Sequence, residues 1–568
     1  MKKYIFLAIA AVAVIACGKK DPVFSDLTLS QTEISAEADG STVSIDVTCA
    51  DNWAASTKAD WITVDPASGS GNATVTVTVA KNEATSARED VLYFNAPAHR
   101  RSVKVVQAAA KAPDGPDVPP TPTKVLSIKS AEDFAAFAAS EYAADETVTL
   151  DADITIKAPA DQLLCSFDGK NHTITLELET TETISDVDPM FAHVGVFRMV
   201  YGAVKDLKVA GTLTHSAEAG SGTYHIGGVA GYAAETASFD NCESSMEIVA
   251  TTKCTHHIGG IIGYSAPGVT VNNCRNKGPV GMIIPAKGAA NASQVGGIIG
   301  HLEANGVVSS CTNSGKVTYE GTGTPRMGGI TGYVNNLVDV TFKDCVNDGT
   351  VEWNEGDYTA SSWSYVGGIT GYFGTPTDGS KVLYENCVNN GNIKCNVTDA
   401  KTKTRCGGIA GHAGRSNSDD GLFTYTYKNC TNNGEVSATS TTGNNHIGGI
   451  LGYSEVSAKI VCDGCTNNGR VYSAGNGAVG GILGMRCSKS SLFTNITVSS
   501  KSSVEGGATS KLGIAFGNVA ELETAVTGKV AGQISKGGEV TVITAENFAG
   551  LIVGNGESVD LSGVTFGN

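Results

Sequence analysis

The segment Ile258-Gly259-Gly260-Ile261-Ile262-Gly263-Tyr264 is one of eight copies of the pattern Ile/Val-Gly-Gly-Ile-x-Gly-Tyr between residues 225 and 485. The first glycine of each copy falls at positions 227, 259, 296, 328, 367, 407, 448 and 480, so the steps are 32, 37, 32, 39, 40, 41 and 32 residues. A recurrence of this length predicts a one-dimensional solenoid, in which each copy packs on its neighbours, rather than a compact enzyme domain.

The core of each copy is a short buried strand. The residue two positions beyond the first glycine is apolar and β-branched in every copy: Val229, Ile261, Ile298, Ile330, Ile369, Ile409, Ile450 and Ile482. Small neighbours let the backbones of adjacent layers approach closely. We predict a long right-handed parallel β-helix for this region, with a more open β-solenoid or stacked hairpins as the alternative.

A second pattern follows in each copy, namely a cysteine with Asn two residues later and Gly two further, as in Cys274, Asn276 and Gly278. Asn and Gly tolerate the left-handed conformation of a corner, and stacked Asn side chains can hydrogen-bond along the axis. Cysteines stacked about 4.8 Å apart point in parallel, which disfavours disulfides, so we predict small buried apolar residues. Seven cysteines occupy this position: Cys242, Cys274, Cys311, Cys345, Cys387, Cys430 and Cys465.

The N-terminus has the pattern of an export signal. Lys2 and Lys3 precede an apolar run over residues 4–14, which is too short to span a membrane and ends at Ala16-Cys17. Residues 1–17 resemble a bacterial lipoprotein signal peptide. This resemblance implies cleavage before Cys17, lipidation of the Cys17 thiol and an anchor in outer-membrane lipid.

Composition and charge limit the classes of partner. Of 568 residues, 41% are hydrophobic and 17% charged, and 69 are Gly, which suits an extended β-rich protein. The formal charge is −17, which repels nucleic acid. We expect no nucleic-acid partner, no cofactor and a monomeric chain.

Residues 25–110 have a different pattern, with short strands of alternating polarity separated by turn residues, which predicts a small immunoglobulin-like β-sandwich. Trp53, the run Asp60-Trp61-Ile62-Thr63-Val64 and the terminal Val105-Val106-Gln107 resemble a BACON domain, a module of lipoproteins and polysaccharide-degrading enzymes of gut Bacteroidetes. The resemblance implies carbohydrate binding, although some members look like spacers. Trp53 and Trp61 are candidates for stacking on a sugar, with packing in the core as the alternative.

The remaining boundaries follow from composition and pattern. Residues 18–24 form a tether, and residues 111–124 form a Pro-rich linker that separates two folded parts. Residues 125–220 begin with a capping helix, from Ser130 to near Tyr142, and continue into the first coils. Residues 221–500 hold the repeats, and residues 501–568 the last coils and C-terminal cap.

The repeats resemble the GLUG motif of bacterial surface proteins and of regions that flank some secreted peptidases. This resemblance implies a surface or adhesin-like role, without catalytic residues. The sequence contains no Gly-x-Ser-x-Gly and no His-Glu-x-x-His motif. We therefore predict no catalytic residue and no metal site, although Cys254, His256 and His257 are a candidate for part of a zinc site.

Two features are candidates for ligand binding. Trp353 and Trp363 lie in an insertion at residues 351–366, which we expect to form an interaction face together with insertions at residues 375–381 and 415–427. The position after the last glycine of each repeat is mostly aromatic, and it predicts either a packed ladder or a stacking platform for an extended glycan. It holds Tyr232, Tyr264, His301, Tyr333, Tyr372, His412, Tyr453 and Met485.

Together these features favour a non-enzymatic lipoprotein of the outer membrane, lipid-anchored at the cell surface or on the periplasmic face, that binds a glycan or host mucin. One alternative is a polysaccharide lyase or glycoside hydrolase of the β-helix type, which would need a few carboxylates brought together by the fold. A second alternative is a structural spacer without a ligand.

Overall fold

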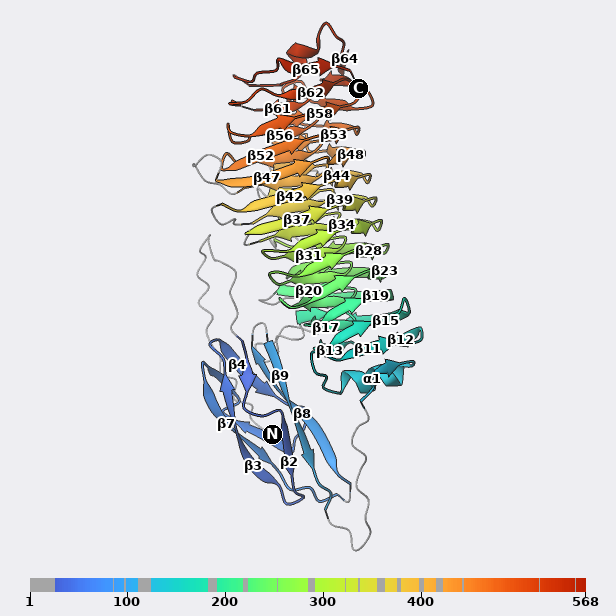
Figure 1. Cartoon of the computed structure of the whole chain (residues 1–568), viewed down its shortest axis with the longest axis vertical. Helices are drawn as coiled ribbons and strands as arrows, with labels where there is room; N and C mark the ends of the chain where they lie inside the picture. The colour runs from blue at the N-terminus through green and yellow to red at the C-terminus, as the bar shows by residue number, and fades with distance from the viewer. Residues whose placement is uncertain are drawn as a thin grey trace.

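The computed structural model describes two parts, a small sandwich and a long solenoid that rises from it (Figure 1). The structure describes residues 26–84, 86–96, 99–110, 124–181, 192–217, 223–252, 254–284, 292–321, 323–335, 338–354, 363–374, 379–397, 403–414, 422–441, 444–519, 521–556 and 558–567. The predicted Cys17, the signal peptide, the tether and nearly all of the Pro-rich linker lie outside these residues.

The sandwich consists of two sheets around one core. A four-stranded antiparallel sheet has the order β1-β3-β7-β5, and a five-stranded sheet has the order β2-β9-β8-β4-β6. These two sheets confirm the small sandwich that the alternating pattern predicted. The strands are β1 (Thr28–Leu29), β2 (Glu33–Ala36), β3 (Ser41–Thr48), β4 (Asn52–Ser56), β5 (Ile62–Asp65), β6 (Ser68–Ser70), β7 (Ala73–Val79), β8 (Arg88–Ala96) and β9 (His99–Gln107).

A helix closes the first end of the solenoid, as predicted, but it ends at Ala138 rather than near Tyr142. Helix α1 (Ala131–Ala138) begins at Ser130, whose side chain accepts a hydrogen bond from the backbone N–H of Asp133. Phe134 and Phe137 are buried against Phe197 of the first coils. The helix therefore covers strand edges and apolar surface that would otherwise face solvent.

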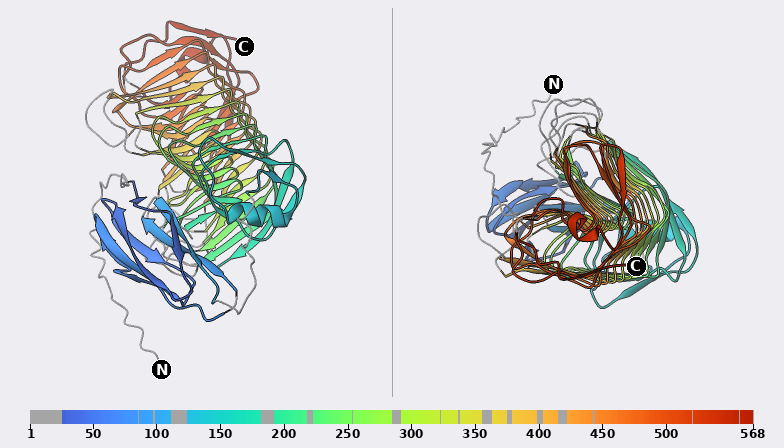
Figure 2. Two further views of the ribbon diagram at one scale, coloured as in Figure 1. Left: turned by 60° about the horizontal axis from the view of Figure 1, so that its bottom comes forward. Right: turned by 90° about the horizontal axis from the view of Figure 1, so that it is seen from above.

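The solenoid is built of parallel coils, which confirms the predicted fold class and excludes stacked hairpins. One coil runs through β30 (Gln294–Gly296), β31 (Ile299–Leu302), β32 (Val307–Ser309), β33 (Thr312–Asn313) and β34 (Val317–Glu320). Each strand pairs in parallel with its counterparts one coil before and one coil after. Seen along the axis, the coils superimpose (Figure 2).

Two of the four solenoid sheets carry the Gly-Gly repeats, the first strand of each repeat in one sheet and the second strand in the other. The ten-stranded sheet contains β16 (His193–Val194), β20 (Thr223–Gly227), β25 (Thr255–Gly259), β30, β35 (Arg326–Gly328), β40 (Trp363–Gly367), β45 (Lys403–Gly407), β50 (Asn445–Gly448), β55 (Gly477–Gly480) and β60 (Lys511–Gly513). The eleven-stranded sheet contains β13 (Ala160–Leu163), β17 (Phe197–Val200), β21 (Ala230–Ala233), β26 (Ile262–Ser265), β31, β36 (Thr331–Val334), β41 (Thr370–Phe373), β46 (Ala410–Ala413), β51 (Leu451–Ser454), β56 (Leu483–Met485) and β61 (Phe516–Asn518).

The other two sheets complete the coil. A 12-stranded sheet runs from β10 (Ser127–Ile128) to β57 (Leu492–Thr494), and a 23-stranded sheet runs from β12 (Ile154–Ile156) to β65 (Gly563–Phe566). At the C-terminal end, β63 (Gln533–Lys536) and β64 (Glu539–Val542) pair as an antiparallel hairpin. No helix among the described residues is long and apolar enough to cross a membrane.

An asparagine ladder runs through the interior, as predicted. The Nδ2 of each member donates to the Oδ1 of the next at 2.8–2.9 Å and to the carbonyl of the glycine two residues along its own coil at 2.8–3.0 Å. The second glycine of each Gly-Gly pair makes room for it, because a Cβ on Gly329 would overlap the Asn347 side chain. The members are Asn276, Asn313, Asn347, Asn389, Asn432 and Asn467, all fully buried.

The position of the left-handed corner was predicted wrongly. It lies at the residue before the cysteine, for example at Asn273 (φ 51°) and Asn386 (φ 55°), and not at the buried Asn two residues after it. The buried Asn is in a strand, where its side chain reaches the next coil. Asn at the corner tolerates positive φ because its short side chain bonds locally.

The cysteine ladder is buried, and every cysteine in the described part of the chain is free. The sulfurs point along the axis, so that Cys345 Sγ donates to the carbonyl of Val308 in the preceding coil at 3.4 Å. Burial raises the pKa of the Cys345 and Cys387 thiols well above its usual value, which keeps them protonated and unreactive. The prediction of small buried apolar residues is confirmed.

The sandwich and the solenoid have separate cores, but the two parts touch at the N-terminal end of the solenoid (Figures 1 and 2). The buried guanidinium of Arg100 lies 3.2 Å from Asp161, which also pairs with Arg198 at 3.3 Å. Gln162 donates a further bond to the carbonyl of Arg100 at 3.0 Å. This junction was not predicted from the sequence.

Candidate functional site

Two columns of side chains stack along the outside of the Gly-Gly sheets, and we call them together the outer ladder. The strands alternate, so the residue two before the first glycine and the residue five after it face away from the core. The first column holds His225, His257, Gln294, Arg326, Tyr365, Arg405, His446 and Ala478. The second holds Tyr232, Tyr264, His301, Tyr333, Tyr372, His412, Tyr453 and Met485.

The rings of the outer ladder pack on one another within and between columns. Tyr232 stacks on Tyr264 with ring centroids 5.3 Å apart, and Tyr264 lies 4.7 Å from His225 of the other column. Most members are buried, but the rings of His225, Tyr264 and Tyr372 remain half-buried. The aromatic position of the repeat is therefore mainly a packed ladder, of which a few rings reach the surface.

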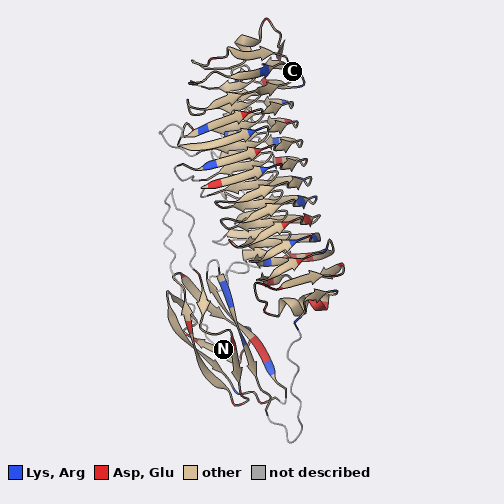
Figure 3. Ribbon diagram, viewed as in Figure 1, with Lys and Arg blue, Asp and Glu red and all other residues tan. Residues whose placement is uncertain are grey.

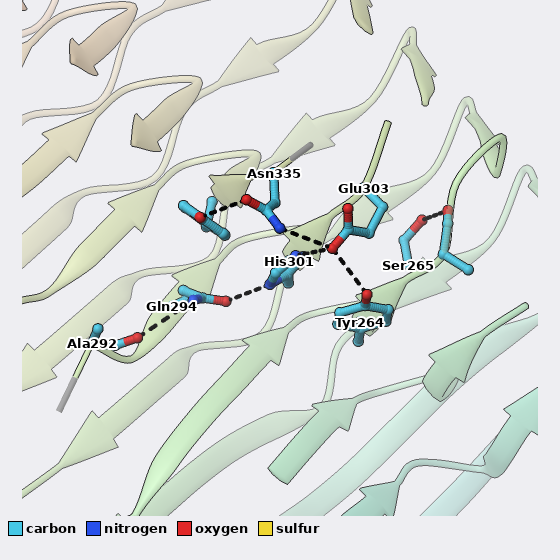
Figure 4. Close-up of polar contacts among 9 residues, drawn as sticks. Tyr264, Ser265, Ala292, Gln294, His301, Glu303 and Asn335 are labelled. Carbon is cyan, nitrogen blue, oxygen red and sulfur yellow. Dashed lines mark hydrogen bonds and ion pairs between the residues drawn. The ribbon is translucent and has the colours of Figure 1, made fainter. Parts of the chain in front are cut away.

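A buried carboxylate accompanies each histidine of the second column. Glu303 accepts bonds from Tyr264 at 3.0 Å, from Asn335 at 3.3 Å and from the Nε2 side of His301 at 2.9 Å (Figure 4). Gln294 binds the other ring nitrogen of His301 at 2.9 Å. Burial by itself raises the pKa of Glu303, but hydrogen bonds headed by that of His301 outweigh burial, and the pKa lies below its usual value.

Glu455 makes a similar cluster further along. It accepts a bond from Tyr453 at 3.2 Å and lies 3.8 Å from His412 and 3.7 Å from Arg405. Burial raises the pKa of Glu455, while His412 and Arg405 lower it by more. Both carboxylates are therefore charged groups held by the ladder itself.

These two carboxylates do not form a hydrolytic pair. Glu303 and Glu455 lie four coils apart, about 19 Å at the spacing of β-strands. Carboxylate pairs that hydrolyse glycosidic bonds are about 5–10 Å apart.

Cations cluster on the later coils of the outer ladder. The guanidinium of Arg326 lies over Tyr333 and Tyr372, at 4.3 and 4.7 Å from the ring centroids. That of Arg405 lies 4.0 Å from the ring of Trp363 and 3.6 Å from that of Tyr453. Such contacts hold the guanidinium groups in place.

Trp363 is the half-buried ring that extends this cluster outward. It begins β40, two residues before Tyr365, and lies on the same side of the strand. Lys403 of the next coil pairs with Trp363 in register, and its Nζ lies 4.4 Å from the ring centroid. The structure thus keeps Trp363 as a candidate for contact with a ligand.

The expected role of Trp353 is wrong, because its side chain is fully buried in the solenoid core. Residue 353 lies in β39 (Val351–Asn354), where its ring faces inward and its Nε1 donates to the carbonyl of Gly321. The alternation of the strand, rather than the insertion, decides the direction of this ring. The flanking insertions lie mostly outside the described residues.

In the sandwich, Trp53 and Trp61 differ in the same way. Trp53 is buried in the core and donates to the carbonyl of Gly71 at 2.8 Å, so it cannot stack on a sugar. Trp61 is half-buried, and Arg88 lies 4.4 Å from its ring centroid. Of the four tryptophans, Trp61 and Trp363 have accessible surface.

The candidate zinc ligands do not converge. His256 faces inward, where it stacks on Tyr224 at 4.9 Å, while His257 faces outward in the outer ladder. Nowhere in the described ranges do three His, Cys, Asp or Glu side chains gather as metal ligands would.

Sequence reasoning missed Arg326 and Arg405 of the first column, as well as the buried Glu303 and Glu455. The signal for the column was available, because its members all stand two residues before the first glycine of a repeat. Their varied chemistry, from His to Gln, Arg and Tyr, hid the common position.

Two family models match parts of the chain. The BACON model, described as "Putative binding domain, N-terminal", matches residues 51–108. The model of the GLUG motif matches residues 291–318. The two resemblances are thereby confirmed in these segments, and no curated protein matches the chain.

Three solved structures are similar to parts of this chain. A Bacteroides ovatus GH5 xyloglucanase in complex with a XXXG heptasaccharide is 22% identical over 16% of this chain and 20% of that chain, with a TM-score of 0.15. A "putative immunoglobulin A1 protease" from Bacteroides ovatus is 16% identical over 55% of this chain and 74% of that chain, with a TM-score of 0.32. A protein from Bacteroides thetaiotaomicron is 18% identical over 17% of this chain and 98% of that chain, with a TM-score of 0.13.

The chain spans about a fifth of the length of the xyloglucanase. The chain is a β-solenoid protein that carries a BACON segment in its N-terminal sandwich and a GLUG motif in its repeats, a combination that fits a surface binding or adhesin-like protein.

Proposed function

We propose that the chain is a non-enzymatic, lipid-anchored surface protein that binds a glycan along the outer ladder of its solenoid. The observation that carries this proposal is the half-buried ring of Trp363, which extends a rigid column of aromatic side chains and has cations beside it. An aromatic ring held by a rigid scaffold offers a flat apolar face at low entropic cost, as carbohydrate recognition needs.

Replacing Trp363 by Ala removes that face. We expect Trp363→Ala to weaken binding to glycans or mucin identified in a glycan screen by about 10- to 100-fold, the range for losing a buried aromatic anchor. Binding is measured by surface plasmon resonance on the full chain.

Trp61→Ala is the matched control, because Trp61 is the half-buried tryptophan of the sandwich. If Trp61→Ala removes binding and Trp363→Ala does not, the sandwich is the binding part. If the chain binds no glycan and no mucin, the proposal is contradicted, and a structural spacer is the function that remains.

The anchor is a separate prediction. We expect Cys17→Ser to release the protein from the membrane fraction into a soluble one, because the acyl chains are the stable attachment that the signal peptide implies. Fractionation of cells, with protease treatment of intact cells to test surface exposure, measures this change. Retention of the Cys17→Ser variant on membranes would show another attachment.

A polysaccharide lyase or hydrolase remains the alternative function. It has less support, since the buried carboxylates of the outer ladder lie too far apart for paired catalysis. Release of reducing ends from any bound polysaccharide by the purified chain would establish this alternative.

A further inference from the structure

The later coils of the outer ladder are cationic, although the chain as a whole carries a formal charge of −17. We define the cationic strip as Arg326, Trp363, Lys403, Arg405 and Arg486. Elsewhere on the solenoid, positive and negative side chains are scattered and often pair between coils (Figure 3). A local excess of positive charge on a chain of negative net charge is typical of a binding site for an anion.

Internal ion pairs account for only part of these charges. Among the described residues, Arg405 and Arg486 share one carboxylate, Glu455, at 3.7 and 3.5 Å. Arg326 and Lys403 have no carboxylate within 4 Å in the same part of the chain, and the buried Nε of Arg326 has no hydrogen-bond partner there. The four cations of the strip thus have one carboxylate among them, that of Glu455. The other buried carboxylate, Glu303, lies on an earlier coil and pairs with His301.

The cations recur at a regular spacing. Arg326 lies on the coil of β35, Lys403 and Arg405 on that of β45, and Arg486 just after β56. Each step is two coils, or about 10 Å at the spacing of β-strands. A ligand that meets all three levels is therefore linear, with acidic groups that repeat along its length.

We propose that the cationic strip binds an anionic polysaccharide, carboxylated or sulfated, lying along the solenoid axis. This inference rests on the proposed glycan binding and names its ligand class. The face of Trp363 packs on a sugar ring, while Lys403 and Arg326 donate charge-assisted hydrogen bonds to the acidic groups. A neutral glycan offers no group that offsets the cost of desolvating these cations.

The test compares three probes on the full chain, namely polygalacturonate, dextran sulfate and neutral dextran. We expect the first, the second or both to bind, with affinity that falls as salt rises, and neutral dextran to bind at least about tenfold more weakly. Binding to polygalacturonate but not dextran sulfate assigns a carboxylate site, and the reverse assigns a sulfate site.

Lys403→Gln locates the site. We expect it to weaken binding of the acidic probe roughly tenfold, the loss of one charge-assisted hydrogen bond, and Lys403→Arg to restore most of it. Lys381→Gln is the matched control, since Lys381 is an exposed lysine of the 12-stranded sheet, off the outer ladder. Circular dichroism checks that each variant is folded.

Three results would overturn the inference. If neutral dextran binds as tightly as the acidic probes, the ligand is not restricted to anionic polysaccharides, although the proposed glycan binding still holds. If Lys381→Gln and Lys403→Gln weaken binding of the acidic probe equally, or if single-stranded DNA binds as tightly as that probe, the chain binds polyanions through charge alone. No binding to any probe, with no hit on a glycan screen, would remove the proposed function as well.

Discussion

Asn389→Ala is expected to destabilise the solenoid by roughly 3–9 kcal/mol. The substitution leaves three buried groups without a partner: one N–H of Asn347, the Oδ1 of Asn432 and the carbonyl of Gly391. Each buried polar group that loses its partner costs about 1–3 kcal/mol. Urea denaturation followed by far-UV circular dichroism, with native-state hydrogen exchange to locate the opened coils, measures the loss.

Asn276→Ala is the control within the same ladder. Asn276 is its first member, and its Oδ1 already has no partner, so the substitution leaves two groups unpaired and removes one buried unsatisfied oxygen. We therefore expect a smaller loss than at Asn389. Equal losses at both positions would show that each Asn acts alone and that the hydrogen-bonded chain adds nothing.

Mild acid is expected to destabilise the protein strongly. Burial, with nearby positive charge at several of them, lowers the pKa of five histidines from 6.5, to about 3 for His193, His256 and His446 and to about 4 for His215 and His412. The unfolded chain takes up a proton at each site below pH 6.5, while the folded chain does not until the pH nears the lowered pKa. The free energy of unfolding should therefore fall by about 2 kcal/mol per histidine between pH 7.5 and 5.

The buried carboxylates of Glu303 and Glu455 do not contribute to this loss of stability between pH 7.5 and 5. The pKa of Glu303 and of Glu455 lies below the ordinary 4.5, so their contribution is lost only at lower pH. Urea denaturation at pH 7.5, 6.5, 5.5 and 5.0 measures the slope. His446→Gln should reduce by one the number of protons taken up on unfolding. His172→Gln, at a more exposed site on the first coils, serves as the control. A flat profile from pH 7.5 to 5 would contradict the burial of neutral imidazoles.

Much of the fold was predictable because the repeat is local. Each Gly-Gly pair, its β-branched core residue and its Cys-x-Asn-x-Gly segment act within one coil and the next, so the period of the sequence is the period of the structure. The cysteine ladder and the capping helix follow from the same local rules. The stacked Asn side chains were predicted as well, although their separation from the corner residue was not.

The candidate site was less predictable, because it depends on the side of the strand. Trp353 and Trp363 lie in one insertion, yet Trp353 faces the core and Trp363 faces outward. Trp53 of the sandwich is buried for the same reason. A one-residue difference in register decides between the two faces of a strand, and a sequence read without its pairings does not fix that register.

The repeat pattern alone was enough to predict stacked coils behind a small sandwich, because glycine, aliphatic and Cys-x-Asn positions recur together along the chain. The parallel strand pairings then excluded the stacked hairpins that the pattern had left open. Which polar side chains meet depends on the folded coils and does not follow from the repeat pattern. Tyr264 and Glu303, Arg405 and Glu455, and the cations beside Trp363 come together because stacking places separate coils about 4.8 Å apart. The contact of the sandwich with the first coils has the same origin, since Arg100 and Asp161 are joined by folding and not by any repeat.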